Sequence, residues 1–420
     1  MASYTDVSLR NKVIYQVFPR QYSNTSNLEG IRKDLDRIKN LGVDIIHLLP
    51  IHKIGLIARK GNLGSPYSVF DYYSIDKNLG TLDDLENLVK SAHEKGIKII
   101  MDMVFNHSSC DSILRDKNLD FYLKELPRKV DDWSDVLDLD YSNPKVVDYF
   151  IDVLKYWIRI VDGFRFDVAA LVPLSFYEKA RKEVSKIKHD NIFLAESVDK
   201  YFIKNLRDRG FTGLSDSELY TVFDCCYDYD IREFFEGIFD SKTNLKKWLL
   251  EVNNQESIYP ANYVKLRSFE NHDMVRLRSR VKTELEFLNY LSLQFFLRGI
   301  SLIYAGEEFS NKKTPSLFEL DLIDYDYKND ISSFISKLSL IHKKDFFSLG
   351  VFQVEKYSSC PVLSYSYASQ KIVGIFNIYQ EDIIDINIPD GKYFNLLEED
   401  TFRIVENKIT SYKKPIIIII

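Results

Sequence analysis

The feature that most constrains this chain is an alternation of short apolar runs with longer amphipathic runs over the first three quarters of its 420 residues. Eight of the apolar runs have the length and β-branched composition of buried strands. They are Val13–Phe18, Val43–Leu49, Ile97–Val104, Gly163–Val168, Ile192–Ala195, Leu219–Phe223, Tyr263–Phe269 and Ile300–Tyr304. Strands that alternate with helices in this way pair in parallel through right-handed crossovers.

The amphipathic runs between these strands predict helices. They are Asn27–Leu41, Leu82–Lys95, Val146–Ile160, Leu174–Ile187, Asp230–Val252, Glu284–Phe296 and Ile331–His342. Eight strand–helix repeats in roughly 340 residues favour an α/β fold of the closed (β/α)8 TIM-barrel type. An open, doubly wound sheet is the structural alternative, because periodicity alone does not separate the two.

Two segments depart from the repeat. The connection after the third strand is about 40 residues long, and a loop of that length inside a barrel is usually functional. We predict a short inserted domain at 107–140, in which Trp133 is a candidate sugar contact. From residue 345 short alternating runs predict a small antiparallel β domain, which divides the chain into a barrel at 1–344 and a C-terminal domain at 345–420. We interpret the isoleucines at 416–420 as its last strand or as an altered end.

The bulk composition excludes several kinds of partner. The formal net charge is −6, which argues against nucleic acid or an anionic membrane as the main partner. We expect no membrane span, because no apolar run reaches about 18 residues. The N-terminal segment MASYTDVSLRNK lacks the apolar core of a secretion signal. The four cysteines form no CxxC pair and are read as buried free thiols. We therefore expect a cytoplasmic protein, and the oligomeric state is left open.

Polar side chains gather where the predicted strands end. Chemistry in a barrel of parallel strands lies at the carboxyl ends of those strands. The segments concerned are Met101–His107, Asp162–Ala169, Ile192–Ser197 and Arg267–Asp273. Each alone has an ordinary explanation, such as a loop cap or an ion pair that closes the barrel. Together they load one face with aspartate, arginine, glutamate and histidine, which indicates a catalytic site.

Two of these segments suggest a pair of carboxyl groups with different protonation states. Arg165 and Asp167 are two residues apart on a strand and therefore point to the same side. An arginine beside a carboxylate keeps it ionised, as a nucleophile requires. Glu196 follows a wholly apolar strand, where a raised pKa would suit a general acid. One ionised and one protonated carboxyl group is what glycoside hydrolysis needs.

The four segments, in this order and at these separations, resemble the motif regions of the α-amylase family, glycoside hydrolase family thirteen. The resemblance covers at least Val13 to Phe309 and includes Tyr15–Pro19, Pro66–Tyr72 and Tyr304–Phe309. It implies a TIM barrel in which 107–140 is a short domain B and the tail is the family's C-terminal β domain.

Site roles follow from the resemblance residue by residue. It implies that Asp167 is the nucleophile, that Glu196 is the acid and later the base, and that Asp273 is the third carboxylate, which grips sugar hydroxyls. The implied substrate-binding residues are Tyr67, His107, Arg165 and His272, and the implied supporting residues are Asp102 and Asn106.

The resemblance implies a retaining glycosidase that cuts α-1,4-glucosidic bonds of maltooligosaccharides or other α-glucans through a covalent glycosyl-enzyme. Typical α-amylases carry a basic residue and a histidine where this chain has Ala170 and Leu171, which argues against classical starch cutting. An α-glucan transglycosylase, or a glucosidase for other small α-glucosides, is the nearest alternative. An inert amylase-like binding protein would have lost a catalytic carboxylate. An aldolase or phosphate-binding isomerase would need a Schiff-base lysine or a phosphate loop, and neither is evident at the strand ends.

We expect no cofactor and no catalytic metal. The loop at 21–27, after the first strand, lacks the acidic pattern of calcium-binding members of the family. Asn106 stands where many members bind a structural calcium ion. The expected partner is an oligosaccharide or glucan substrate.

Overall fold

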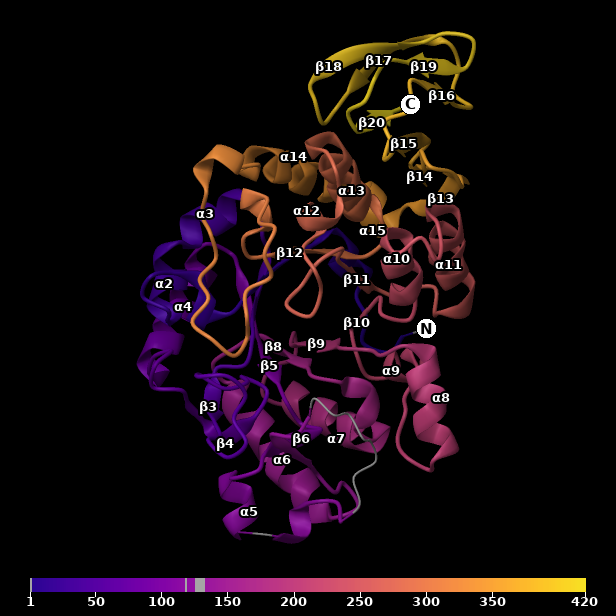
Figure 1. Ribbon diagram of the computed structural model, residues 1–420. Coiled ribbons are helices and arrows are strands. Elements are labelled where there is room, and N and C mark those ends of the chain that lie inside the picture. Colours follow the sequence, from indigo (N-terminus) through magenta and orange to yellow (C-terminus); the bar gives the residue numbers. More distant parts are fainter. Residues whose placement is uncertain (1, 118, 125–132) are drawn as a thin grey trace. The chain divides into compact units, whose positions relative to one another are not determined.

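The computed structural model describes residues 2–117, 119–124 and 133–420 (Figure 1). Eight parallel strands form a closed barrel in the spatial order β1, β12, β11, β10, β9, β8, β5, β2. Their bounds are β1 (Val13–Val17), β2 (Ile45–Leu48), β5 (Lys98–Met103), β8 (Gly163–Phe166), β9 (Ile192–Ala195), β10 (Cys225–Tyr227), β11 (Lys265–Arg267) and β12 (Ile300–Tyr304). The predicted TIM-barrel fold is therefore confirmed.

The chain divides into two compact units. The first consists mainly of Ile14–Asp230 together with Pro315–Asp324, and the second mainly of Ile231–Thr314 and Tyr325–Ile420. Strands β1, β2, β5, β8, β9 and β10 belong almost entirely to the first unit, whereas β11, β12 and the C-terminal sheet belong to the second.

Strand register in the first unit places particular side chains next to one another. Gln16 on β1 pairs with His47 on β2, and Asp102 on β5 pairs with Arg165 on β8. The strands β8 and β9 approach so closely at Gly163 that a Cβ atom there would lie 2.2 Å from the carbonyl oxygen of Ile192. Glycine at this position therefore permits the close pairing of the two strands that lead to Asp167 and Glu196.

Helices follow the strands in both units. Those of the first unit are α1 (Pro19–Tyr22), α2 (Leu28–Lys33), α3 (Leu35–Asn40), α4 (Leu82–Glu94), α5 (Ile113–Lys117), α6 (Pro144–Trp157), α7 (Leu174–Ser185), α8 (Lys200–Asp208) and α9 (Asp216–Leu219). Those of the second unit are α10 (Arg232–Phe239), α11 (Leu245–Ile258), α12 (Leu277–Arg280), α13 (Glu284–Phe296), α14 (Ser332–His342) and α15 (Asp345–Leu349). None of the helices in the described residues is long and apolar enough to cross a membrane.

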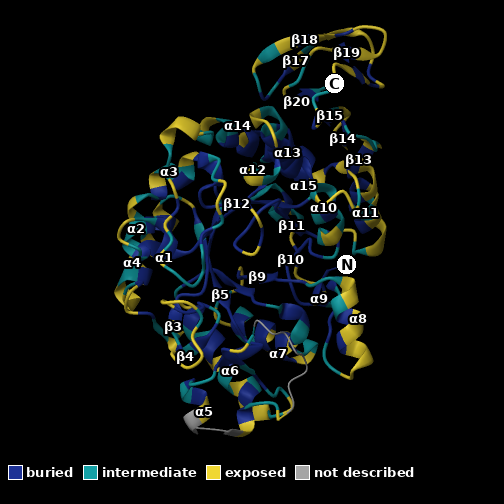
Figure 2. Cartoon of the chain, viewed as in Figure 1, coloured by how far each residue is buried: buried dark blue, intermediate teal, exposed yellow. Residues whose placement is uncertain are grey.

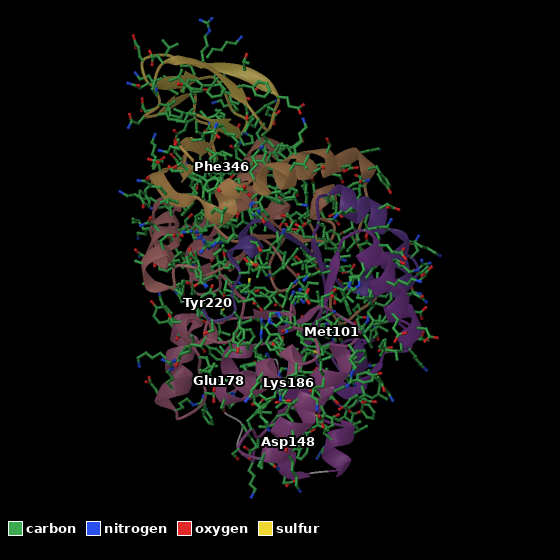
Figure 3. The ribbon with its side chains drawn as sticks, turned by 180° about the vertical axis from the view of Figure 1, so that it is seen from behind. Met101, Asp148, Glu178, Lys186, Tyr220 and Phe346 are labelled. Atoms are coloured by element: carbon green, nitrogen blue, oxygen red, sulfur yellow. The ribbon has the colours of Figure 1, made fainter. Side chains whose placement is uncertain are left out.

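The core of the first unit lies between the strands and the helices around them. Met101 on β5 is fully buried, whereas Asp148 on α6 and Glu178 on α7 are exposed on the outer helices (Figure 3). Thr81 caps the start of helix α4, and its side chain and backbone exchange hydrogen bonds with Asp84 in a capping box.

One predicted strand is wrong. The run Leu219–Phe223 was expected to be the sixth strand, but it lies at the end of α9 and in the turn that follows, and the strand is β10. Glu218 accepts hydrogen bonds from the backbone and side chain of Ser215, which starts a helix three residues earlier. Leu219, Val222 and Phe223 are buried at helical spacing, so periodicity over so short a run misidentified the element.

Two predicted helices are each divided in two. The run Asn27–Leu41 breaks at Asp34 into α2 and α3, and Asp230–Val252 forms α10 and the first part of α11. In the second case the side chain of Asn244 accepts a hydrogen bond from the backbone of Lys247 and starts a new helix. Helix α8 was not predicted.

Antiparallel sheets lie outside the barrel in both units. In the first unit, β3 (His52–Ile54) pairs with β4 (Val69–Ile75), and β6 (His107–Ser109) pairs with β7 (Val136–Asp138) inside the inserted segment. The C-terminal sheet has the order β13, β14, β15, β20, and two further two-stranded sheets pair β16 with β19 and β17 with β18. These strands are β13 (Val351–Lys356), β14 (Val362–Tyr367), β15 (Gln370–Ile375), β16 (Ile383–Asp385), β17 (Gly391–Asn395), β18 (Asp400–Ile404), β19 (Lys408–Thr410) and β20 (Ile416–Ile419).

The terminal isoleucines form a true strand. Ile418 on β20 pairs with Val373 on β15, and Ile416, Ile417 and Ile418 are each about 99% buried, at 1% relative exposure. Ile416 and Ile418 belong to the apolar core of the C-terminal domain, and Figure 2 draws buried residues in dark blue. The interpretation of this run as a last strand is confirmed.

Removing side-chain volume from this strand should destabilise the C-terminal sheet. We expect Ile418→Ala to cost about 2–5 kcal/mol of unfolding free energy, because it leaves a cavity in the core. The matched variant Ile420→Ala, at a 45% exposed position, should change it by no more than about 0.5 kcal/mol. Urea unfolding of both variants measures the difference. Equal effects at the two positions would contradict the packing described here.

Candidate active site

A single buried guanidinium contacts three carboxylates in the first unit. Arg165 on β8 is fully buried, and its Nη1 donates to both oxygens of Asp102, at 2.7 and 2.8 Å, and to Oδ1 of Asp167 at 3.0 Å. Its Nη2 lies 2.9 Å from Oε2 of Glu196. Asp102 lies on β5, Asp167 directly follows β8, and Glu196 directly follows β9. Neighbouring strands of the barrel therefore bring together residues far apart in the sequence.

Burial and ion pairing act in opposite directions on this cluster. Burial alone would raise the pKa of Asp102, but the positive charge of Arg165 and a contact with His47 outweigh it and hold the pKa below its ordinary value. Burial likewise opposes the charge of Arg165, yet the carboxylates around it raise its pKa well above the ordinary value. Asp102 and Arg165 are therefore an ionised pair at neutral pH.

Glu196 has more polar surroundings than the sequence suggested. Besides the Arg165 contact, its Oε2 accepts a hydrogen bond of 2.6 Å from the backbone N–H of Val168. Val168 has a φ of 37°, in the left-handed region that β-branched residues rarely adopt. The strand β8 ends before Val168, and the turn there directs a backbone donor at Glu196. Strained backbone of this kind is concentrated at functional sites.

Tyr67 joins the same cluster from the loop before β4. Its hydroxyl donates to Oδ2 of Asp102 at 3.2 Å, and the guanidinium carbon of Arg165 lies 5.8 Å from the centre of its ring. Sequence reasoning missed two further members, His47 and Gln16. The Nε2 atom of His47 lies 3.5 Å from Oδ2 of Asp102, and its Nδ1 atom lies 3.3 Å from Nε2 of Gln16. Both lie within predicted strands, and a polar residue between apolar neighbours was the sequence feature that could have identified them as members of the site.

His107 and Asn106 lie at the start of the inserted segment. The ring of His107 is 5.2 Å from that of Trp133, and its Nδ1 atom is 3.1 Å from the amide nitrogen of Asn106. The same amide nitrogen donates to Oδ1 of Asp138 at 3.2 Å, so a donor rather than an oxygen ligand faces this acid. Among the described residues no three histidine, cysteine or acidic side chains could together hold a metal ion.

Asp273 and His272 lie in the second unit, in the loop after β11. Nε2 of His272 is 3.1 Å from Oδ2 of Asp273, whose side chain is 39% exposed. The backbone N–H of Asp273 donates to the side chain of Asn271, and its carbonyl oxygen accepts a hydrogen bond from Arg232. The loop thus presents a partly exposed carboxylate beside a buried histidine.

Two buried residues that the sequence analysis passed over anchor this loop. Glu270 and Arg276 form an ion pair of 2.6 Å, and Glu270 also accepts a hydrogen bond from the backbone of Leu277. Arg276 donates to the carbonyl oxygen of Ala305 at 2.7 Å. Burial and the negative charge of Glu270 raise the pKa of Glu307 well above its ordinary value. The ion pair between Glu270 and Arg276 therefore joins the two ends of the loop that carries His272 and Asp273.

Neutralising Asp102 should reduce stability in a pH-dependent way. The pKa of Asp102 is below 3.8 in the folded state, so its stabilisation is present above pH 3.8 and is lost as the pH falls through the lower folded-state value. We expect Asp102→Asn to cost about 1–3 kcal/mol at pH 7. Urea unfolding at several pH values should show that the difference in unfolding free energy between the variant and the wild type becomes smaller below pH 3.8. A gap that is constant with pH would contradict the ionised pair.

Two protein-family descriptions match this chain. The description "Alpha amylase, catalytic domain" matches residues 16–133 and 114–345, and "Bacterial Alpha amylase C-terminal domain" matches residues 353–418. The crystal structure of an α-amylase from Lactobacillus plantarum is 39% identical, with a TM-score of 0.94 over 99% of this chain and 100% of that chain.

Two further proteins are similar over most of the chain. The crystal structure of a maltogenic α-amylase from Thermotoga neapolitana is 30% identical, with a TM-score of 0.87 over 98% of this chain and 99% of that one. An intracellular maltogenic amylase from Bacillus subtilis is 25% identical over 385 residues, which cover 80% of this chain and 62% of that protein. The chain spans between half and two thirds of the length of the first curated relatives it matches.

Proposed function

Because the chain belongs to the α-amylase family of glycoside hydrolases, we propose that it hydrolyses α-1,4-glucosidic bonds of maltooligosaccharides with retention of configuration. The observation that carries the proposal is the contact of Asp167 and Glu196 with one guanidinium, that of Arg165. A shared contact favours a short separation of the two carboxyl groups, and retaining enzymes hold theirs about 5–5.5 Å apart.

Charge balance supports different roles for the two acids. Three carboxylates share one guanidinium, so full ionisation would leave the buried cluster with excess negative charge. Nearby like charges favour protonation of one member. The role of general acid requires a protonated carboxyl group, so we assign the shared proton to Glu196.

The proposed reaction has two steps. Asp167 attacks the anomeric carbon and forms a covalent ester while the glycosidic C–O bond breaks, and Glu196 gives its proton to the leaving oxygen. Glu196 then removes a proton from water, whose oxygen displaces Asp167 from the anomeric carbon. Two inversions give net retention. We assign the binding of the reacting sugar to Asp273, His272 and His107, together with Tyr67.

The turn after the nucleophile supports a preference for short substrates. Ala170 is fully buried, and its carbonyl oxygen accepts a hydrogen bond from the backbone of Leu214. Neither Ala170 nor Leu171 offers a polar side chain to a sugar on the leaving-group side. Two similar proteins are named maltogenic, which also suits action on short α-glucans.

The organisation of the chain completes the proposal. We assign residues 1–344 to the catalytic barrel, with 107–140 as domain B, and residues 345–420 to the C-terminal domain. The similar protein from Bacillus subtilis is named as intracellular, and we propose a cytoplasmic location for this chain as well.

A time course of maltoheptaose digestion tests the function. We expect shorter maltooligosaccharides or glucose, and the order in which lengths appear separates cleavage within the chain from cleavage at its ends. Products longer than maltoheptaose would instead indicate transfer to a sugar acceptor. A lack of turnover on this substrate and on other α-glucosides would favour an inert binding protein and contradict the proposal.

Replacement of the nucleophile should abolish turnover without unfolding the protein. We expect Asp167→Asn to lower kcat on the order of 10⁴-fold or more, because a step that cannot begin blocks the whole reaction. The matched control is Asp162→Asn, at the opposite end of β8, where the carboxylate contacts Lys188 and His93 rather than the site. Its kcat should stay near the wild-type value. A kcat for Asp167→Asn close to that of the control would contradict the assignment.

A further inference from the structure

We propose that His47 and Gln16 are positioning residues, which hold Asp102, and through it Arg165, in the geometry that the two catalytic carboxylates require. The inference rests on the proposed function and adds to it two residues that touch neither the reacting atoms nor the sugar. It is carried by a chain of side-chain contacts that crosses neighbouring strands inside the first unit.

The chain of contacts follows the order of the strands. Gln16 on β1 and His47 on β2 pair in register, and their side chains meet at 3.3 Å. His47 reaches Asp102 on β5 at 3.5 Å, and Asp102 binds Arg165 on β8. Gln16, His47, Asp102 and Arg165 are all fully buried. Water therefore cannot replace a contact that is lost, and each group depends on its neighbour.

The chemistry of these groups fixes the proton on His47. Nε2 of His47 approaches the ionised Asp102 at 3.5 Å, outside hydrogen-bond geometry, and a hydrogen on Nε2 makes this electrostatic contact favourable because Asp102 can only accept. Burial lowers the pKa of His47, so the ring is neutral and Nδ1 has a free lone pair. Nδ1 then accepts from the amide nitrogen of Gln16, which also donates to the hydroxyl of Tyr227 at 3.4 Å. The hydrogen bond from Gln16 and the charge of Asp102 thus favour the same tautomer of His47.

Loss of the Nε2–H group of His47 would affect the catalytic carboxylates, because Asp102 and Arg165 connect His47 to them. Nη1 of Arg165 is shared between Asp102 and Asp167, so rotation of the Asp102 carboxylate changes the hydrogen bond to the nucleophile. The ring of Tyr227 lies 5.6 Å from the guanidinium carbon, which joins the Gln16 end of the chain to the same arginine. His47 stays neutral, so it orients Asp102 without competing with Arg165 for its charge.

Three variants separate positioning from packing. His47→Leu removes the donor with a side chain of similar size, whereas His47→Gln keeps an N–H that can reach Asp102. The matched control is His52→Leu, because His52 is equally buried but packs against Tyr72 and Trp157. Steady-state kinetics on the substrate that the wild type cleaves are measured together with urea unfolding of each variant.

We expect His47→Leu to lower kcat on the order of 10- to 100-fold, since small misplacements of catalytic groups have effects of this size. KM should change little, because the contact orients reacting groups and does not bind the sugar. His47→Gln should recover most of the lost kcat, and His52→Leu should alter stability alone. Equal kcat values for His47→Leu and His52→Leu, or no recovery in His47→Gln, would overturn the proposal.

A measurement that needs no turnover distinguishes failure of this inference from failure of the proposed function. In protein labelled with ¹⁵N-histidine, the His47 signal is identified by its loss in His47→Gln, and we expect the neutral Nε2–H form at pH 6–8. An Nδ1–H or doubly protonated ring would overturn the positioning role. If His47 shows the expected tautomer but the protein cleaves no α-glucoside, the contacts from Gln16 to Arg165 stand and only the glycosidase assignment is contradicted.

Discussion

The charge on Arg165 organises the acidic side chains of the first unit. A buried cation is stable only when it is paired, and three carboxylates from neighbouring strands meet that need. One carboxylate, Asp102, is fully buried and serves as the fixed partner, whereas Asp167 and Glu196 remain slightly accessible. The same guanidinium therefore contacts both Asp167 and Glu196, the proposed nucleophile and acid, and any shift of Arg165 alters both contacts.

The barrel explains why residues so far apart in sequence meet. Parallel pairing puts Asp102 opposite Arg165, and the close approach of β8 and β9 at Gly163 brings the Glu196 strand alongside. The second unit also contains a buried ion pair, in which Glu270 and Arg276 join the ends of the loop that carries Asp273. In both units a buried ion pair orders a more accessible carboxylate, which is a common arrangement for preorganised sites.

The sequence predicted the barrel and the acids at its strand ends, because strand–helix alternation and terminal polar residues are local signals. It did not predict β10, since the run Leu219–Phe223 is apolar at a spacing that suits either element. Nor did it predict the part played by His47, whose partners come from other strands. The backbone turn at Val168 was also missed, because its donor to Glu196 depends on a φ value that no residue pattern indicates. These features depend on tertiary contacts, which local periodicity in the sequence does not indicate.

The central claim is that Asp167 and Glu196, held by one guanidinium, act as nucleophile and acid in a double displacement. The most direct test is ¹H NMR of the first sugar released from maltoheptaose, recorded before mutarotation mixes the anomers. Retention predicts that the newly formed reducing end appears first as the α anomer and drifts towards equilibrium afterwards. A β anomer appearing first would mean a single displacement by water, and would contradict both the role of Asp167 and the account built on Arg165.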